Sequence, residues 1–240
     1  MYRFFTENIP DEKGIIVIDG PDHNHLKNSL RIRISEKIQI VSNDIIYDVE
    51  ISEILEDCIK TKIINIDEKS YESPLSIHLY QGYCKGDKMD FIIQKAVELG
   101  VDEITPLLTN RTVVKIKEGK AQSKIKRFEK IIEEAAKQSK RKNIPIIHPP
   151  LSLGQLEVQD EYTIVAYEEE EESLKTILET DSINSVNVII GPEGGFEKEE
   201  IEKLQGMGAR SVSIGNRILR AETAALALLS ILQYEKGDLN

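Results

Sequence analysis

Two glycine-bearing turns near the C-terminus are the part of this sequence best suited to chemistry on a bound ligand. The first, Gly-Pro-Glu-Gly-Gly-Phe at residues 191–196, follows a run rich in β-branched residues at 186–190. The second, Ile-Gly-Asn-Arg-Ile-Leu-Arg at residues 214–220, leads into a long apolar helix predicted over 222–234. A glycine turn between a strand and a helix lets a ligand approach backbone N–H groups, because no side chain intervenes. Both turns are therefore candidate ligand-binding loops.

Short apolar runs alternate with helical stretches from residue 75 onward. Buried strands are predicted at 75–80, 103–107, 162–167, 186–190 and 211–214, and helices at 87–99, 123–139, 171–179, 197–205 and 222–234. This alternation predicts an α/β domain with a mostly parallel sheet. Such sheets bind ligands at the carboxyl ends of their strands, where both glycine turns lie.

The first seventy residues follow a different pattern. Runs rich in β-branched residues predict strands at 14–18, 37–41, 45–51 and 58–64, and a helix is predicted over 22–33. These features predict a small β-rich domain, folded as a barrel. We place the boundary so that residues 1–72 form the first domain and residues 73–240 the second.

Composition limits the class of protein. The chain has 240 residues, 40% hydrophobic and 30% charged, as in an ordinary soluble globular protein. It shows no signal-peptide pattern and no apolar run near the roughly 20 residues that cross a bilayer. Cys58 and Cys84 lack disulfide-framework and metal-type spacing, and His78 and His148 have no partner in sequence. We expect a cytoplasmic protein with no metal site and no membrane partner.

Charge is distributed unevenly along the chain. Residues 111–142 contain twelve Lys or Arg and four acids, a net charge of +8, which leaves −19 for the rest of a chain whose net charge is −11. This basic segment could bind RNA phosphates, or it could be a solvated helix face. The overall acidity argues against a protein that coats nucleic acid indiscriminately.

Several motifs, in order along the chain, resemble those of the 16S ribosomal RNA uridine N3-methyltransferase family, which belongs to the SPOUT superfamily. The two glycine turns resemble that family's cofactor loops. Other segments that resemble the family lie at 85–90, 94–101, 109–114 and 134–141. Near the N-terminus, His25-Leu26 followed by Leu30-Arg31 resembles the family's short RNA-facing helix. The likeness is patchy before residue 74 and dense after it.

The resemblance implies a fold, a cofactor and partners. The fold would be a SPOUT-type parallel sheet with a C-terminal trefoil knot, preceded by a PUA-like β-barrel that binds RNA. Sequence rules alone would not produce a knot, since knots are almost absent from proteins. The cofactor would be S-adenosylmethionine (SAM), and the substrate 16S rRNA or the small ribosomal subunit. The enzyme would be a homodimer whose active site borrows residues across the interface.

The resemblance also implies a cofactor site within the two turns. Its residues would be Gly191, Glu193, Gly194, Gly195, Ile214, Gly215 and Leu219. The three glycines of the first turn would let the backbone close on the donor, and Ile214, Gly215 and Leu219 would contact the adenine. Glu193 would hold its own loop by accepting backbone N–H bonds.

Methylation of uracil N3 requires the loss of a weakly acidic proton. The enzyme therefore needs a base, or a cation that stabilises negative charge on the flanking carbonyl oxygens. Arg220 is the first candidate for the cation and Arg217 the second. Glu222 is a candidate base, although a carboxylate at a helix start also stabilises the helix.

RNA binding would fall to basic residues in both halves of the chain. The candidates are Arg31, Arg33, Arg111, Lys124, Arg127 and Arg141. Arg111 and Arg141 could instead contact the second subunit of a dimer.

Other functions remain open. A ribose 2′-O-methyltransferase of the same superfamily would carry an Asn-and-Arg motif before its first helix and a Ser-Leu-Asn-Val-Ser type final loop, from which residues 85–87 and 213–219 both differ. A non-catalytic RNA-binding protein that no longer binds the donor could carry larger residues in place of the loop glycines. The glycines of both loops are present here, which counts against that alternative. A nucleotide-binding oxidoreductase is disfavoured, because residues 81–87 fit the G-x-G-x-x-G fingerprint poorly.

Overall fold

The computed structural model describes residues 1–69, 71–114, 119, 121–157, 162–179 and 183–239. The chain gathers into two compact units. The N-terminal unit comprises Met1–Tyr71 and Ala136–Asn143, and the C-terminal unit comprises Glu72–Ala135 and Ile144–Asn240. No helix in the described ranges is long and apolar enough to span a membrane.

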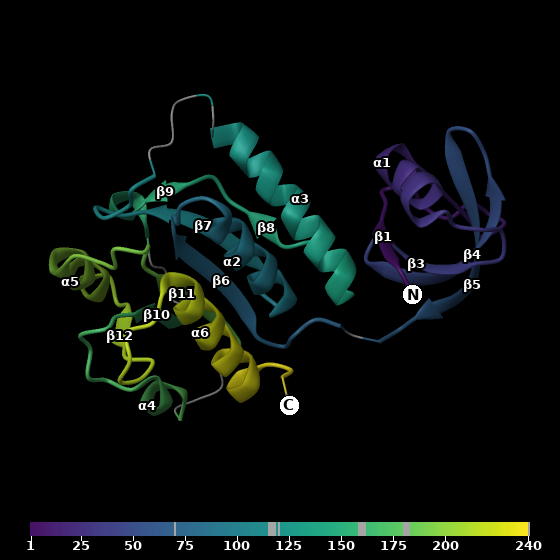
Figure 1. The fold of residues 1–240 in the computed structure, drawn as a ribbon. Coiled ribbons are helices and arrows are strands. Elements are labelled where there is room, and N and C mark those ends of the chain that lie inside the picture. Colours follow the sequence, from purple (N-terminus) through teal and green to yellow (C-terminus); the bar gives the residue numbers. More distant parts are fainter. Residues whose placement is uncertain (70, 115–118, 120, 158–161, 180–182, 240) are drawn as a thin grey trace. The chain divides into compact units, whose positions relative to one another are not determined.

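A curled five-stranded sheet forms most of the N-terminal unit (Figure 1). Its strands lie in the order β1 (Arg3–Phe5), β3 (Lys37–Ser42), β4 (Ile45–Ile54), β5 (Cys58–Asp67) and β2 (Ile15–Asp19). β1 is parallel to β3, and the other neighbours are antiparallel. Alternate residues such as Ile16 and Ile18 on β2, or Val49 and Ile51 on β4, are buried in one apolar core, as the two-residue period of a strand requires.

The helix predicted over 22–33 is shorter and consists of two parts. α1 (Gly20–Asn24) is an α-helix, and η1 (His25–Leu30) continues it as a π-helical turn. Leu26 is fully buried in the core of the unit. Arg31 has a φ of +52°, in the left-handed region, and ends the helix. The predicted last turn through Arg33 was therefore wrong.

A parallel sheet forms the centre of the C-terminal unit and confirms the predicted α/β class (Figure 1). The strand order is β12 (Arg210–Val212), β10 (Tyr162–Ala166), β11 (Ser185–Ile190), β6 (Ser76–Gly82), β7 (Glu103–Leu108) and β8 (Ile146–Ile147), and β9 (Leu151–Ser152) also pairs with β7. Every one of these pairs is parallel. β11 is a nearly continuous buried run, as expected of a strand that is covered on both faces.

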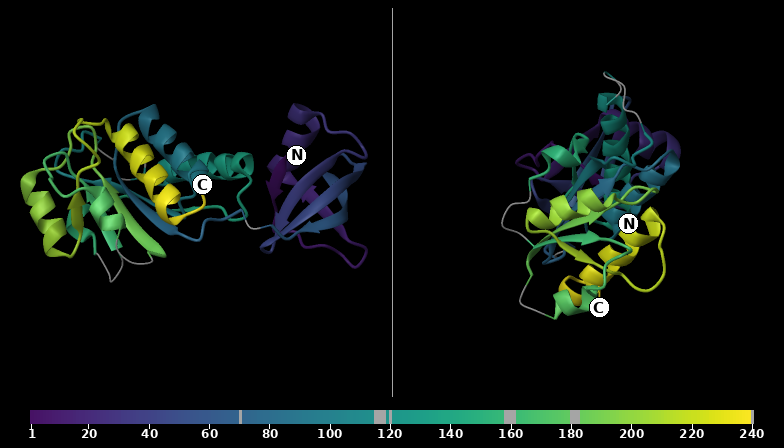
Figure 2. Two further views of the ribbon diagram at one scale, coloured as in Figure 1. Left: turned by 90° about the horizontal axis from the view of Figure 1, so that it is seen from below. Right: turned by 90° about the vertical axis from the view of Figure 1, so that its left-hand side faces the viewer.

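Helices cover both faces of this sheet. α2 (Asp87–Glu98) and α6 (Ala221–Lys236) lie side by side on one face (Figures 1 and 2). On the other face, α5 (Lys198–Gly206) and the short 3-10 helix η2 (Leu153–Gln155) pack around Val165, Ile189 and Leu204. The remaining helices that the structure describes are α3 (Ala121–Ser139) and α4 (Leu174–Leu178).

α4 is shorter than the helix predicted over 171–179. Ser173 caps it, since its side chain accepts a hydrogen bond from the backbone N–H of Lys175 at 3.3 Å. Glu172 lies outside the helix, and its backbone carbonyl accepts the N–H of Ser213 at 2.8 Å. The run of glutamates therefore belongs to a loop at the carboxyl edge of the sheet.

Candidate active site

Three loops meet at the carboxyl edge of the parallel sheet. They follow β10, β11 and β12 and comprise residues 167–173, 191–197 and 213–220. The first and third loops are joined by the hydrogen bond from Ser213 N–H to Glu172 O. The sequence predicts the second and third loops as ligand-binding turns, and the structure adds the first.

Close approaches fix the backbone of the first glycine turn. Gly195 has a φ of +69°, and a Cβ there would lie 3.1 Å from Glu168 Oε1 in the neighbouring loop. Gly82, at the end of β6, lies so close that a Cβ would be 2.2 Å from Pro192 N. The N–H of Gly195 donates to Pro192 O at 2.9 Å and closes the turn. A side chain at Gly82 would therefore displace the turn, and one at Gly195 would strain its left-handed backbone.

A cavity of about 350 Å³ lies among these loops. Its lining includes Lys88, Glu168, Gly191, Glu193, Gly194, Gly195, Leu219 and Arg220. A smaller cavity of about 60 Å³ shares Glu168 and Leu219 with it and adds Ile214, Gly215 and Arg217. All seven residues predicted to hold a cofactor therefore line two neighbouring cavities. The larger of the two lies within the ~300–1,000 Å³ typical of small-molecule sites.

Lys88, in the first turn of α2, stands between two carboxylates at this cavity. Its Nζ lies 3.4 Å from Glu193 Oε1 and 3.4 Å from Glu222 Oε2. Glu193 Oε1 also accepts a hydrogen bond from the backbone N–H of Lys85 at 3.1 Å. Glu193 thus fastens the first glycine turn to the start of α2.

The surroundings of this cluster favour charged side chains. Burial lowers the pKa of Lys88, but the carboxylates of Glu193 and Glu222 outweigh burial and raise that pKa above its ordinary value. Burial raises the pKa of Glu193, yet the backbone N–H groups of Lys85 and Glu193 and the ammonium of Lys88 hold it below its ordinary value. Lys88 is therefore protonated at neutral pH and serves as a fixed positive charge rather than as a base.

The three predicted catalytic side chains differ in burial. Glu222 Oε2 is buried and accepts no hydrogen bond from the described residues, although Lys88 Nζ is near. The side chains of Arg217 and Arg220 are exposed, and within the described part of the chain neither forms an ion pair. Arg220 borders the larger of the two cavities, where its guanidinium is free to meet negative charge on a ligand.

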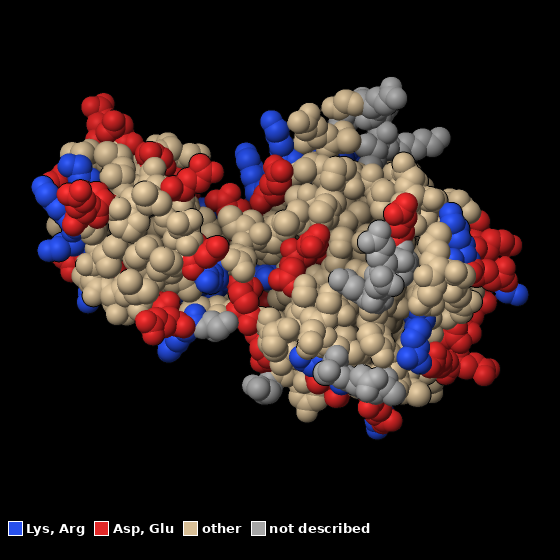
Figure 3. Space-filling model, turned by 180° about the vertical axis from the view of Figure 1, so that it is seen from behind, with Lys and Arg blue, Asp and Glu red and all other residues tan. Residues whose placement is uncertain are grey.

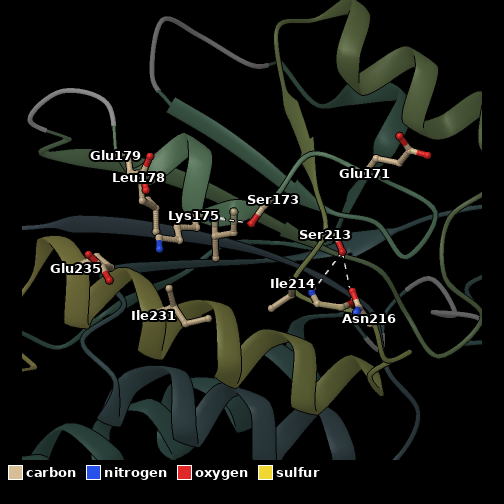
Figure 4. A pocket seen from close by; sticks show the side chains of 12 residues that line it. Glu171, Ser173, Lys175, Leu178, Glu179, Ser213, Ile214, Asn216, Ile231 and Glu235 are labelled. Atoms are coloured by element: carbon tan, nitrogen blue, oxygen red, sulfur yellow. Dashed lines mark hydrogen bonds between the residues drawn. The ribbon is translucent and has the colours of Figure 1, made fainter.

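A third cavity, of about 450 Å³, lies on the other side of the loop after β12, between α4 and α6 (Figure 4). Its lining includes Leu174, Leu178 and Ile231, with the carboxyl groups of Glu171, Glu179 and Glu235. Of the predicted cofactor residues it contains only Ile214 and Gly215. We therefore assign the candidate site to the cavity at the first glycine turn, because a ligand can reach the main chain there.

Arg111 and Lys124, two of the predicted RNA-binding residues, contact the first glycine turn and the ring of Tyr83. Arg111 Nη1 donates a hydrogen bond to Gly194 O at 3.0 Å, so this side chain borders the first glycine turn. Lys124 Nζ lies 4.8 Å from the centre of the Tyr83 ring, within the range of a cation–π interaction.

The other predicted RNA-binding residues lie in different surroundings. Arg31 and Arg33 are exposed in the N-terminal unit. Arg127 forms an ion pair with Asp90 on α2. Arg141 is only 4% exposed, so its side chain is not part of the surface. Acidic side chains crowd the edge of the C-terminal unit that carries α5 (Figure 3), which leaves that edge poorly suited to phosphate.

Two charged residues that line the cavity, Lys88 and Glu168, were not predicted as site residues. Lys88 falls within the segment 85–90 that was singled out, but its ion pairs join it to residues far along the chain, which no local spacing reveals. Glu168 begins the run of five glutamates, a pattern that is typical of a solvated loop.

Comparison with known proteins places most of the chain in one family. Residues 71–233 match the family model of the RNA methyltransferase domain. The chain is 33% identical to ribosomal RNA small subunit methyltransferase E of Bacillus subtilis, over 99% of this chain and 100% of that protein. It is 37% identical to the protein of the same name from Buchnera aphidicola subsp. Schizaphis graminum, over 99% and 98% of the two chains.

Solved structures agree with this match. Ribosomal RNA small subunit methyltransferase E of Neisseria gonorrhoeae, bound to SAM, is 28% identical and superposes with a TM-score of 0.89 over 100% of both chains. A Legionella pneumophila protein in complex with the cofactor SAM is 32% identical, with a TM-score of 0.90 over 99% of both chains.

Proposed function

We propose, since the chain belongs to the RNA methyltransferase domain family, that it transfers the methyl group of SAM to N3 of a uridine in 16S rRNA. Its full-length relatives are named as methyltransferases of the small-subunit ribosomal RNA. Two similar structures were solved with SAM bound. The choice of N3 is supported by the sequences of the two glycine turns and of residues 85–90, which resemble those of the uridine N3-methyltransferase family.

The observation that carries this proposal is the cavity at the first glycine turn. Its wall contains Gly191, Gly194 and Gly195, where a ligand can approach the main chain. The carboxylates of Glu168 and Glu193 also line it, and they complement the positive charge of a sulfonium. These features fit SAM, which would supply an electrophilic methyl group when bound.

The second turn would hold the adenine and meet the substrate. Ile214, Gly215 and Leu219 line the adjoining small cavity, where apolar contacts and main-chain groups can orient a flat ring. Arg217 and Arg220 lie on the same loop with exposed side chains. The donor and the RNA base would therefore meet along one loop.

Arg220 and Glu222 would supply the chemistry at the uracil. The guanidinium of Arg220 would stabilise the negative charge that spreads over the carbonyl oxygens when N3 loses its proton. Glu222 would accept that proton with its carboxylate, which lies 3.4 Å from the Nζ of Lys88, a residue that lines the cavity. Lys88 would hold Glu222 and Glu193 in place through its two ion pairs. Arg217 would be the second cation.

The finer fold features belong to the same proposal. β12 follows β11 and α5 in sequence but pairs with β10, and the chain then returns to form α6 beside α2. A trefoil knot would require this part of the chain to pass through the loop after β10. The curled N-terminal sheet would be a PUA-like barrel, with the exposed Arg31 and Arg33 among its RNA contacts.

A homodimer and an RNA surface complete the proposal. α2 and α6 expose large apolar side chains, with Phe91 44% and Tyr234 69% accessible, which supports burial of this pair of helices in a subunit interface. Arg111 and Lys124 would contact RNA near the cavity. The buried Arg141 would contribute only by supporting the structure around it. Modification would take place in the cytoplasm, on 16S rRNA or the small ribosomal subunit.

The test is methyl transfer followed by identification of the product. The protein is incubated with isotope-labelled SAM and small ribosomal subunits that lack the modification, and the RNA is digested to nucleosides for mass spectrometry. Labelled 3-methyluridine is the expected product. A labelled 2′-O-methyl nucleoside would instead support the ribose methyltransferase, and SAM binding without any labelled product would refute this substrate.

A further inference from the structure

Two histidines and a glutamate meet on one face of the parallel sheet, away from the glycine turns. His148 Nε2 lies 2.5 Å from Glu103 Oε2, and His78 Nδ1 lies 3.9 Å from the same oxygen. One donor atom from each of the three side chains lies within 4.8 Å of the other two. The glutamate is thus close to both imidazoles.

Strand pairing brings these residues together from distant parts of the chain. His78 on β6 is the register partner of Glu103, the first residue of β7 (Figure 1). His148 directly follows β8, and its backbone N–H donates to Ile104 O on β7 at 2.8 Å. The cluster lies toward the amino ends of β6 and β7, whereas the glycine turns lie at the carboxyl edge of the sheet.

The hydrogen bonds of His78 leave one ring nitrogen available. Its Nε2 bonds to the hydroxyl of Thr105 at 2.8 Å, and its ring stacks on Tyr80 with the centres 4.0 Å apart. These contacts orient the ring so that Nδ1 faces Glu103. A histidine that binds a metal ion through one ring nitrogen commonly has its other ring nitrogen in a hydrogen bond, as Nε2 of His78 is with Thr105.

We propose that His78, Glu103 and His148 form a binding site for a divalent transition-metal ion of the zinc type. Two imidazoles and one carboxylate are a donor set that Zn²⁺ uses, with its fourth position left to water. The side chains of Glu103 and His148 are 42% and 37% exposed, so an ion and a water molecule can reach them.

The observed distances require only side-chain adjustment. Donor atoms bound to one tetrahedral Zn²⁺ at about 2.0–2.1 Å lie ~3.4 Å apart. His148 Nε2 and Glu103 Oε2 would therefore separate by about 1 Å as the ion replaces their hydrogen bond, and His78 Nδ1 would approach that oxygen by about 0.5 Å. The donor atoms of the two histidines, which lie within 4.8 Å of each other, would approach by up to about 1.4 Å. The partial exposure of Glu103 and His148 leaves room for rotation about their side-chain bonds.

A bound ion would stabilise the edge of the sheet at β8. β8 is only two residues long and pairs with β7 alone among the described strands. A metal ion would link the segment after β8 to both β6 and β7 without touching the cavity at the glycine turns. Binding should therefore stabilise the fold, and the melting temperature should rise with metal concentration.

Metal titration of the full-length protein tests this proposal. After treatment with chelator and its removal, Zn²⁺ binding is measured by calorimetry, and Co²⁺ binding by its visible absorption. We expect one equivalent of Co²⁺ with the absorption of a low-coordinate site. His148→Gln should weaken binding by at least about 100-fold, because loss of even an outer-shell partner costs 10–100-fold.

Two further variants make the outcome decisive. Glu103→Gln should weaken metal binding to a similar degree. His25→Gln removes a histidine from the N-terminal unit and should leave the affinity for metal unchanged. Circular dichroism without metal shows whether each variant is folded. Failure to bind Zn²⁺ or Co²⁺, or equal binding by the wild type, His148→Gln and Glu103→Gln, would overturn the proposal.

Discussion

Gly82→Ala would place a methyl group against the main chain of the first glycine turn. Its Cβ would lie 2.2 Å from Pro192 N and 2.4 Å from the carbonyl carbon of Gly191. Unstrained contacts between such atoms lie at about 3.5–4.0 Å, so the turn must move by more than ~1 Å. Overpacking of this kind costs about 1–3 kcal/mol. If that strain is relieved by moving the turn, affinity for SAM should fall by ~10-fold or more, since 1.4 kcal/mol corresponds to tenfold.

The measurement is calorimetric titration with SAM, together with thermal unfolding. The same strain should lower the melting temperature by about 2–12 °C in a chain of this size. Gly206→Ala is the matched control, because Gly206 ends α5 and a Cβ there meets nothing within 4 Å. It should bind SAM like the wild type and be equally or slightly more stable. Wild-type affinity and stability in Gly82→Ala would show that β6 does not support the cofactor turn.

Two further sets of substitutions and one labelling experiment test separate features of the protein. Arg220→Ala should lower kcat for methyl transfer by ~10²–10³-fold with little change in SAM affinity, as steady-state kinetics will show, and an unchanged kcat would exclude its role in charge stabilisation. Lys124 and the exposed Lys126 both lie on α3. Lys124→Glu combined with Lys126→Glu should weaken RNA binding in filter assays but not SAM binding, and an RNA affinity equal to that of the wild type would show that α3 is not part of the RNA surface. Burial, assisted by Glu193, raises the pKa of the Cys84 thiol to about 12. Because the thiolate is the reactive form, iodoacetamide at pH 8 should label the partly exposed Cys58 before Cys84, and faster labelling of Cys84 would contradict its burial.

Much of the fold follows from local sequence patterns. The apolar runs of β6, β7, β10 and β11 are long enough to show a strand pattern, and the glycines mark where two of these strands end. β8 and β9 could not be predicted in this way, because two residues carry no periodicity. The glutamates before α4 have helix propensity, but the hydrogen bond between Glu172 and Ser213 holds them in a loop.

The candidate site was predictable where its residues are adjacent in sequence. Both glycine turns could be found because their residues are contiguous and follow strands. Lys88 and Glu222 come together only when α2 and α6 pack side by side, which no single segment encodes. His78 and His148 had no partner in sequence for the same reason, since β-sheet register alone places them beside Glu103.

The roles proposed for the residues of the two glycine turns, for Lys88 and for Glu222 all depend on the donor lying at those turns. Backbone hydrogen exchange, followed by mass spectrometry with and without SAM, tests that position most directly. We predict slower exchange at residues 191–196 and 213–220 when SAM is present, with no change at residues 174–179 of the cavity between α4 and α6. Protection of residues 174–179 without protection of residues 191–196 would contradict the assignment and place the donor in the other cavity.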